Sequence, residues 1–384
     1  MDMIKIPESW GVKREPRTPV DQRKDIITLG KSYEELFDWD ILFSEALQIG
    51  GGRIILVGPP LYELHELIHF SDGKKELNHT SLDLTNVTVT LVESSSNTIY
   101  LEHPEESVEI PVGDICGDFN GEGCIATMQK DEPIHWIKDW VQYYHVEHGV
   151  KGFVIYDNNS QTYTVEELQA ELDAMPYDIS VHVEDWSMPF GPHTPTWDSN
   201  FSQFTSFEHF KYKYAWCATF AINHDIDEFL VIREGNINSL IIQMQAKGLA
   251  ALIYRTRNID PYNERLDTSA HMLPIEERRY KDYYHYSEYN NTNNTKVGKR
   301  LIDKWLLIPE RAMEVQWRVH DFNGSAAVAK VTPESGIYFA HFYAMQSKHK
   351  NNHPSFYNRN QQLVDKGDIM VDEVLRDKMR KVYE

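Results

Sequence analysis

The pattern of hydrophobic and polar residues in this chain changes near residue 120. Before that point, short runs of alternating polar and apolar residues predominate, as in TNVTVTLV from Thr85 to Val92. This alternation is typical of a strand with one buried face. Two further apolar runs of strand length, 54–57 and 99–101, are separated by turn residues that begin at Gly58. Residues 1–118 are therefore predicted to form a small strand-rich module with a loose N-terminal arm.

From residue 124 onward, strand-like and helix-like segments alternate. Apolar runs predict four strands, at 124–128, 152–156, 179–183 and 218–223. The segments between them carry helical signals: a start at Pro133 followed by apolar residues at helical spacing, a capping box from Thr164 to Glu167, and aromatic residues from Phe204 to Tyr214. The alternation predicts an α/β fold in which a mostly parallel, Rossmann-like sheet is covered by helices on both faces.

Two polar clusters fall at the ends of predicted strands, YDNNS at 156–160 and HDIDEF at 224–229. Parallel sheets bind their ligands beyond the carboxyl ends of the strands. Asp225 and Asp227 are two positions apart, so in an extended segment both face one side while Ile226 turns into the protein. Two such carboxylates suit Mg²⁺ or Mn²⁺, and this ion can neutralise a departing diphosphate. The alternative is a solvated strand end whose acids cap the next turn, which the βα pattern disfavours.

Composition narrows the class of protein. The 384 residues carry a net charge of −21, which argues against a nucleic-acid-binding protein because such proteins need a basic surface. The first twenty residues contain no apolar core of signal-peptide length, and no later stretch has the roughly 20 apolar residues of a membrane helix. We therefore expect a soluble, cytoplasmic protein without a transmembrane segment.

The three cysteines, Cys116, Cys124 and Cys217, form an odd number and lack the spacing of a metal-binding knuckle. A disulfide between Cys116 and Cys124 is one alternative. Reduced thiols in a cytoplasmic protein are the simpler interpretation.

Five parts of the chain together carry a family resemblance: KDEPIHWIKDWVQYYHVEHGVKGFVIYDNNS at 130–160, EDW at 184–186, HDIDEFL at 224–230, His320, and AHFY at 340–343. Through them, residues 124–345 resemble glycosyltransferase family 92, which implies the GT-A fold. Phe342 stands where the family has a tyrosine, and NNTKVGKR at 293–300 matches the family's lysine-serine segment only loosely, so the acceptor stays undefined. The resemblance implies a GT-A domain at 119–345 with the tail 346–384 packed on it.

The resemblance further implies a nucleotide-sugar-dependent hexosyltransferase. The donor would be a UDP-sugar, with galactose as the expected sugar, the acceptor a glycan hydroxyl, and the transfer inverting. Asp225, Asp227 and His341 would hold Mn²⁺ or Mg²⁺ against the donor diphosphate, which makes Asp227 a catalytic residue as well. Without the resemblance, a core histidine with a satisfied hydrogen bond would be the simpler interpretation of His341.

Five further residues are candidates for binding the donor. Asp157 and Asn158 follow a buried strand and are expected to bind the uracil or the ribose, although this segment also forms an Asx turn readily. Thr127 and Lys130 lie where the chain leaves the first strand of the sheet, and we expect them to bind the base and the diphosphate. Lys348, near the C-terminus, is expected to close over the phosphates.

An inverting transfer needs a general base for the proton of the acceptor hydroxyl. We assign this role to Glu277 in IEERR at 275–279, with Glu276 and Asp260 as alternatives. Trp186 and Trp197 follow the third strand and are candidates to stack on the acceptor sugar. The alternative is that they are core aromatic residues beneath a loop.

Two other functions are compatible with the pattern. Paired aspartates at strand ends also serve metal-dependent phosphoesterases, which usually recruit further Asp or His ligands from other strand ends. A non-catalytic carbohydrate-binding protein is the second alternative, because small β modules such as the one at 1–118 often bind glycans.

Overall fold

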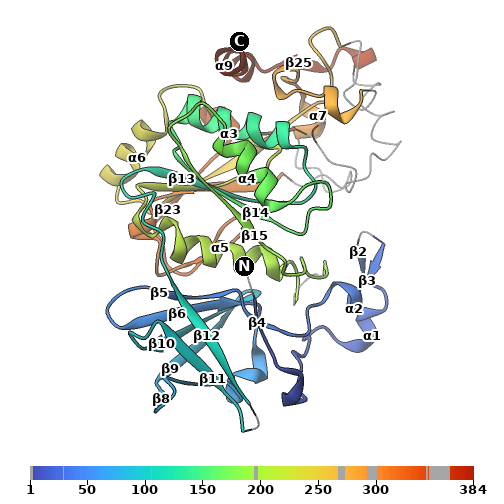
Figure 1. The fold of residues 1–384 in the computed structure, drawn as a ribbon. Coiled ribbons are helices and arrows are strands. Elements are labelled where there is room, and N and C mark those ends of the chain that lie inside the picture. The colour runs from blue at the N-terminus through green and yellow to red at the C-terminus, as the bar shows by residue number, and fades with distance from the viewer. Residues whose placement is uncertain are drawn as a thin grey trace.

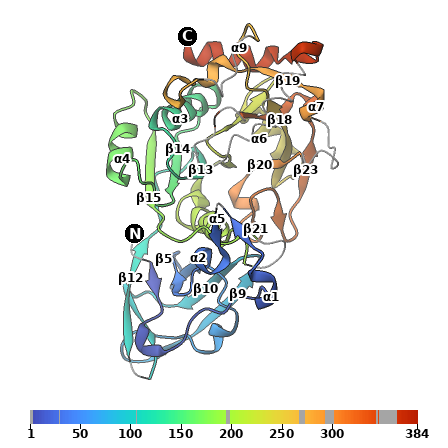
Figure 2. The ribbon, with the colours of Figure 1, turned by 90° about the vertical axis from the view of Figure 1, so that its right-hand side faces the viewer.

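The computed structural model describes residues 3–28, 30–104, 106–193, 198–266, 273–291, 301–342, 345 and 364–384. A strand-rich part lies at the bottom of Figure 1 and an α/β part lies above it. Helix α5 (Phe201–Lys213) runs between the two parts. Figure 2 shows the same stack from the side, with α9 (Glu373–Tyr383) at the end far from the strand-rich part.

The strand-rich part contains an eight-stranded sheet among the described residues, in the order β8-β7-β11-β12-β5-β6-β10-β9. Its strands are β5 (Glu45–Gln48), β6 (Arg53–Gly58), β7 (His69–Ser71), β8 (Glu76–Leu77), β9 (His79–Leu84), β10 (Val87–Glu93), β11 (Thr98–Glu102) and β12 (Ser107–Asp114). The strands predicted at 54–57, 85–92 and 99–101 are confirmed as β6, β10 and β11. Neighbouring strands are antiparallel except for β12 and β5.

The N-terminal arm is packed, so the prediction of a loose arm is wrong. Strand β1 (Ile4–Lys5) pairs with β4 (Ile41–Phe43), and Ile6 and Trp10 are buried in the core of the strand-rich part. The apolar residues of the arm are too scattered to show a period, which is why the sequence did not reveal this packing. The other short elements here are η1 (Glu8–Trp10), α1 (Val20–Arg23), β2 (Ile27–Thr28), β3 (Lys31–Ser32), α2 (Tyr33–Leu36) and η2 (Tyr62–Glu66).

The α/β part contains a nine-stranded sheet among the described residues, in the order β15-β14-β13-β16-β20-β18-β24-β17, with β23 also paired to β18. The four predicted strands are confirmed as β13 (Gly123–Gln129), β14 (Gly152–Asp157), β15 (Ser180–Asp185) and β16 (Phe220–Asn223). These four pair in parallel. The remaining strands are β17 (Glu228–Ile232), β18 (Ala251–Ile259), β20 (Asp303–Leu307), β23 (Val328–Val331) and β24 (Ile337–Phe342).

This second half of the sheet is mixed. β20 runs antiparallel to β16 and to β18, and β17 runs antiparallel to β24. β18 pairs in parallel with both β23 and β24, so β17 and β20 are the strands that run against the others and the sheet is mostly parallel, as expected. After β16 the chain turns back at once into β17, so the regular alternation of strand and helix from which we predicted parallel pairing ends there.

Helices cover both faces of the sheet, as predicted. The core on one face includes residues of α3 (Ile134–His148), α4 (Val165–Asp173), α6 (Ile237–Ala246) and α9, whereas α5 packs on the other face. Successive strand residues serve opposite cores: Ile125 points to the α3 side and Cys124 to the α5 side. The predicted helix signals are confirmed, since α3 follows Pro133 and Thr164 caps α4.

The C-terminal helix α9 packs against α3. Gln142 Nε2 donates to the carbonyl of Val382 at 2.7 Å, and Lys378 and Lys381 both pair with Glu147. The remaining elements are η3 (Ala215–Cys217), η5 (Ile275–Glu277), η6 (Tyr280–Asp282), β19 (His285–Ser287), α7 (Glu288–Asn291), η8 (Pro309–Arg311), β21 (Gln316–Trp317), β22 (Phe322–Asn323), η9 (Pro333–Ser335) and β25 (Ile369–Val371). Within the described ranges, no helix has both the length and the apolar character needed to span a bilayer.

Candidate active site

The acidic motif forms the short connection between β16 and β17. Its first residue, His224, is buried, with Nε2 2.9 Å from the hydroxyl of Tyr254 and Nδ1 hydrogen-bonded to the hydroxyl of Tyr144. Burial, with the nearby charge of Lys304, lowers the pKa of His224 well below its usual value, so the ring is neutral. His224 therefore anchors the start of the loop that presents the carboxylates.

Lys304 on β20 is the cation of this site. Its side chain is fully buried, and Nζ lies 2.9 Å from Glu228 Oε2 and 3.3 Å from Asp225 Oδ1. Burial alone would lower the pKa of Lys304, but the charges of Asp225 and Glu228 raise it. The same Glu228 oxygen accepts the backbone N–H of Asp225 at 2.9 Å, which fixes the loop in this conformation.

Glu228 is a buried carboxylate with an unusual pKa. Burial raises its pKa to about 7, and the negative charges of Asp225 and Asp227 add to this effect, whereas Lys304 opposes it. Its second oxygen, Oε1, is buried and has no hydrogen-bond partner among the described residues. The cluster thus holds three acidic side chains against one ammonium group, an excess of negative charge that favours a bound cation.

Asp227 and His341 lie side by side. The pairing of β17 with β24 sets Glu228 opposite His341, and the N–H of Phe342 donates to the carbonyl of Asp227 at 2.9 Å. This register brings Asp227 Oδ2 to 3.3 Å from His341 Nε2. Strand β24 thus delivers His341 to the acidic motif.

The donor set of Asp225, Asp227 and His341 fits a manganese or magnesium ion in chemistry, because it combines two hard carboxylates with an imidazole. In the described structure these three do not place one ligand atom each within 4.8 Å of one another. Asp225 turns to Lys304 instead. Its side chain is 34% exposed, so it has room to rotate toward Asp227.

His320 is the first of the two C-terminal histidines in the resemblance, and its ring lies near the same cluster. Its Nδ1 is 2.8 Å from the carbonyl oxygen of Asp303, the residue before Lys304. Desolvation and the charge of Lys304 lower the pKa of His320, while the Asp303 carbonyl and the charge of Asp225 oppose this. His320 therefore borders the acidic cluster from the β20 side.

Asp157 and Asn158 lie at the end of β14, as predicted, and both are buried. Asp157 accepts hydrogen bonds from the N–H and hydroxyl of Ser160 and from Gln129 Nε2. Asn158 Nδ2 donates to the carbonyls of Trp186 and Met188 at 3.0 and 2.7 Å. These bonds favour the Asx-turn interpretation, and the nucleoside contact stays a prediction.

Thr127 and Lys130 lie at the end of β13. Thr127 is buried, and its hydroxyl has no hydrogen-bond partner among the described residues. Lys130 is exposed directly after the strand. Both residues lie where the predicted contact with the donor requires them. No interaction in the structure tests this contact, so it stays a prediction.

The aromatic candidates and the C-terminal lysine are placed differently. Trp186 is fully buried, its Nε1 donates to Ser202 Oγ at 3.0 Å, and its ring packs on Tyr156. This burial favours the core interpretation over stacking on a sugar. Trp197 and Lys348 lie outside the described residues.

The segment that carries Glu277 packs against the acidic motif. The hydroxyl of Tyr280 donates to the carbonyl of Ile226 at 2.8 Å, and the carbonyl of Arg278 accepts from Trp136 on α3. Glu276 and Glu277 are both exposed on η5. The third candidate base, Asp260, is buried and bonded to Asn290, an arrangement that suits a structural role better than proton transfer.

Sequence reasoning missed Lys304, the pairing of Glu228, and Tyr280. Glu228 belongs to the predicted motif, but the sequence analysis assigned it no function. The apolar residues next to it were the feature of the sequence that could have indicated its burial. Lys304 gave no comparable sign, because one lysine in the stretch DKWLL fits any strand with one solvated side.

Comparisons with known proteins place the chain in a family. The model of glycosyltransferase family 92 matches residues 122–379, a range that contains every residue of the acidic cluster. Among solved structures, the chain is similar to the apo structure of the WbbM bifunctional glycosyltransferase, with a TM-score of 0.32 and 9% identity over 73% of this chain. The match covers 54% of that protein, so this chain spans about half its length. A search of curated proteins finds no match.

Proposed function

We propose that this chain, which belongs to glycosyltransferase family 92, transfers a hexosyl group from a UDP-sugar to a glycan hydroxyl with inversion, using Mn²⁺ or Mg²⁺. Galactose is the sugar we expect. The observation that supports this proposal most directly is the pairing of Asp227 with His341 beside two further acids. A negative cluster beyond the carboxyl ends of parallel strands suits a cation that holds a diphosphate.

Asp225, Asp227 and His341 are the residues that we assign to the metal ion. Bound there, the ion would act as a Lewis acid on the departing diphosphate. Lys304 would stay paired with Glu228, which is almost fully buried and cannot reach solvent. Asp225 is the partner that can leave Lys304, because its side chain is the exposed one of the two.

The donor contacts are assigned to the strand ends next to this cluster. Thr127 has a buried hydroxyl available for the base or ribose. Asp157 and Asn158 would shape the nucleoside loop through their internal hydrogen bonds, with Asn158 keeping its amide oxygen for the ligand. Lys130 and Lys348 would approach the phosphates.

In the transfer step, the acceptor hydroxyl oxygen would bond to the anomeric carbon from the face opposite the diphosphate. Its proton would pass to Glu277, and the bond from the anomeric carbon to the diphosphate oxygen would break, so that UDP leaves with the bonding electrons. Tyr280, three residues after Glu277, contacts the acidic motif from η6, and this proximity along the chain supports the assignment.

A thermal-shift panel of UDP-, GDP-, CMP- and TDP-sugars, with Mn²⁺ or with EDTA, tests the proposal. A ligand that binds the folded state raises its Tm, and we expect the largest rise from UDP-galactose with Mn²⁺. EDTA should abolish the rise, and so should Asp227→Ala, whereas Asp178→Ala on the surface should keep it. The release of UDP from UDP-galactose should fall more than about 100-fold in Asp227→Ala.

Equal shifts with all four nucleotides would contradict the donor assignment. Release of phosphate from a phosphomonoester, without release of UDP from the sugar nucleotide, would favour the phosphoesterase alternative. Glycan binding without either activity would favour a carbohydrate-binding protein.

A further inference from the structure

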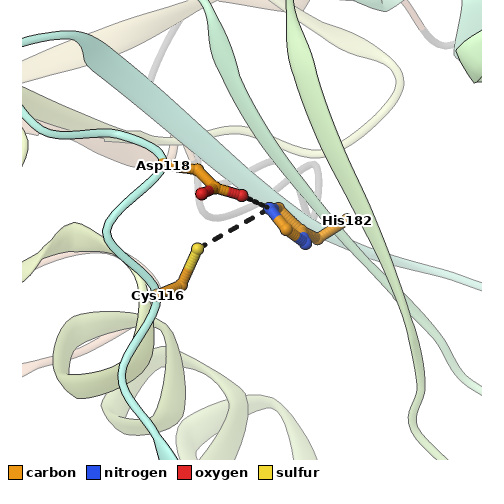
Figure 3. Close-up of side chains that lie close together, drawn as sticks. All are labelled: Cys116, Asp118 and His182. Atoms are coloured by element: carbon orange, nitrogen blue, oxygen red, sulfur yellow. Dashed lines mark hydrogen bonds and ion pairs between the residues drawn. The ribbon is translucent and has the colours of Figure 1, made fainter.

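The connection between the two sheets carries a second group of metal-ligating side chains. Cys116 and Asp118 lie between β12 and β13, and His182 lies on β15, the edge strand of the α/β sheet. Figure 3 shows the three side chains converging from the connection and the strand. One ligand atom of each lies within 4.8 Å of the other two, a spacing that no other His, Cys, Asp or Glu set reaches in the described ranges.

The measured separations suit one tetrahedral ion. His182 Nε2 lies 3.1 Å from Asp118 Oδ2 and 3.7 Å from Cys116 Sγ. Zinc bonds of about 2.0–2.1 Å to nitrogen and oxygen and about 2.3 Å to sulfur imply tetrahedral edges of about 3.4 Å for N–O and about 3.6 Å for N–S. The two observed distances differ from these edges by roughly 0.3 Å or less, so an ion fits with small side-chain shifts.

The surroundings hold these side chains in place. The ring of His182 packs against Phe119 and Tyr214, with centroid distances of 5.6 and 5.0 Å. The backbone of Cys116 is fixed at both its polar groups: its N–H donates to the carbonyl of Lys213 at 2.7 Å and its carbonyl accepts from Trp216 Nε1 at 2.9 Å. A surface His–Asp pair alone would contribute little stability and would need no thiol beside it. Preorganised ligands are what a metal site requires.

We propose that Cys116, Asp118 and His182 bind one zinc-class divalent ion, with water as the fourth ligand, and that this ion ties the inter-sheet connection to the edge strand. A thiolate, an imidazole and a carboxylate select a borderline-soft ion over Mg²⁺. The side chain of Asp118 is 56% exposed, which leaves space for water.

This site is separate from the acidic cluster. Cys116 and Asp118 precede β13, whereas Asp225 and Asp227 follow β16, so the two sites lie toward opposite ends of the parallel strands. Their chemistry differs as well, because the acidic cluster offers no sulfur. Changes at one site should therefore leave metal binding at the other intact.

Titration of the metal-free full-length chain with Co²⁺, followed by absorption spectroscopy, tests the proposal. We expect the Co²⁺ bound at this site to produce a sulfur-to-cobalt charge-transfer band and tetrahedral d–d bands, whereas Co²⁺ at the acidic cluster, which has no sulfur ligand, adds no charge-transfer band. Cys116→Ser should abolish the charge-transfer band. It should also lower the affinity for Zn²⁺, measured by competition with Co²⁺, at least about 100-fold, which exceeds the loss typical when a residue that only supports a metal ligand is changed. Cys217→Ser is the matched control, because its Sγ points to the Cys116 carbonyl at 3.9 Å and lies outside the cluster.

A second readout does not depend on the thiol. Zn²⁺ should raise the Tm of the wild type and of Asp227→Ala, and adding His182→Ala to Asp227→Ala should remove that rise. The side chain of His182 is 30% exposed, so this substitution should fold. The proposal is overturned if the folded wild type shows no sulfur band, or if the band survives Cys116→Ser. Loss of the band in Cys217→Ser, or an undiminished Zn²⁺ shift when His182→Ala is added to Asp227→Ala, would also overturn it.

Discussion

Lys304 organises the charges of the active site at the scale of single residues. Its ammonium group is fully buried, and the cost of removing it from water is offset by Asp225 and Glu228. Glu228 is as buried as Lys304, whereas Asp225 reaches solvent. If Asp225 turns to a metal ion, Lys304 still has Glu228 Oε2 at 2.9 Å, so the site can exchange one partner without leaving the ammonium group unpaired.

The pH dependence of stability tests this arrangement through Glu228→Gln. Burial raises the pKa of Glu228 from 4.5 to about 7 in the folded protein. The folded state therefore binds this proton more tightly than the unfolded state does, so the stabilisation is complete below pH 4.5 and is lost as pH rises to 7. Relative to Glu228→Gln, the wild type should lose up to about 3 kcal/mol of unfolding free energy across this window.

Urea unfolding of both proteins in EDTA, at several values between pH 4.5 and 7.5, measures this difference. Glu147→Gln is a useful control, because Lys378 and Lys381 lower the pKa of Glu147 against the opposing effect of its burial. The stabilisation from Glu147 is complete above pH 4.5 and is lost only at lower pH, so the difference between Glu147→Gln and the wild type should stay nearly constant over this range. If the unfolding free energies of the wild type and Glu228→Gln differ by the same amount at every pH in this range, the raised pKa of Glu228 is contradicted.

The sequence predicted some of these residues and not others, for physical reasons. Asp225 and Asp227 were found because a local spacing and a strand end are both visible in the chain. The approach of His341 could be predicted only through the resemblance to a family, because the register of β17 with β24 is a long-range property. Lys304 could not be predicted at all, since nothing local separates a buried paired lysine from a solvated one.

At the scale of elements, burial patterns predicted strands better than they predicted strand direction. β14 and β17 are both continuous apolar runs that are buried throughout, yet β14 is parallel to its neighbours and β17 is antiparallel to β24. A strand covered on both faces needs the same side chains in either direction. The regular alternation with helices decides the direction, and it ends after β16.

The end of β14 is tied to the segment after β15 by one side chain, Asn158. Its amide donates to the carbonyls of Trp186 and Met188, of which the second also accepts from the hydroxyl of Ser202. Asn158→Ala should therefore cost about 2 kcal/mol of unfolding free energy, chiefly from the loss of these two hydrogen bonds. Asn159→Gly is the control, because Asn159 is exposed, makes a single 3.2 Å bond across the same gap and has a φ of 61°, which glycine adopts without strain; its cost should be below about 0.5 kcal/mol. Equal costs in urea unfolding would show that Asn158 does not hold the two segments together.

At the scale of the whole molecule, α5 joins the two sheets, as Figure 1 shows. His209 and Lys213 on α5 reach Glu45 of the strand-rich part at 2.9 and 3.0 Å. These interactions hold the pKa of Glu45 at about 2 although its burial acts in the opposite direction. A second contact, at Asp198 just before α5, joins the two parts through neutral donors. Because the contacts at this junction are polar, they leave no hydrophobic pattern in the sequence. The sequence therefore showed that the pattern of apolar residues changes near residue 120, but not that the two parts pack together.

Asp198→Asn tests whether this junction makes the two sheets unfold together. Asp198 is buried and accepts hydrogen bonds from the N–H and hydroxyl of Thr18 and from the hydroxyls of Tyr33 and Tyr62. Its φ of 62° is one that asparagine also tolerates, so the substitution changes the charge and leaves the backbone in place. An amide has one acceptor oxygen for these donors where the carboxylate has two, and we expect a cost of about 3 kcal/mol.

Hydrogen exchange resolves where that cost falls. In Asp198→Asn the amides of β6 and β10 should lose protection, while those of β13 and β14 should stay near wild-type values, because the junction stabilises the strand-rich part against separate opening. Asp178→Asn, which changes an almost fully exposed carboxylate, should leave both sheets unchanged. If protection falls equally in both sheets, the two parts unfold as one cooperative unit even when the Asp198 carboxylate is absent. If it falls in neither, the contacts between Glu45 and α5 are sufficient to hold the strand-rich part in place.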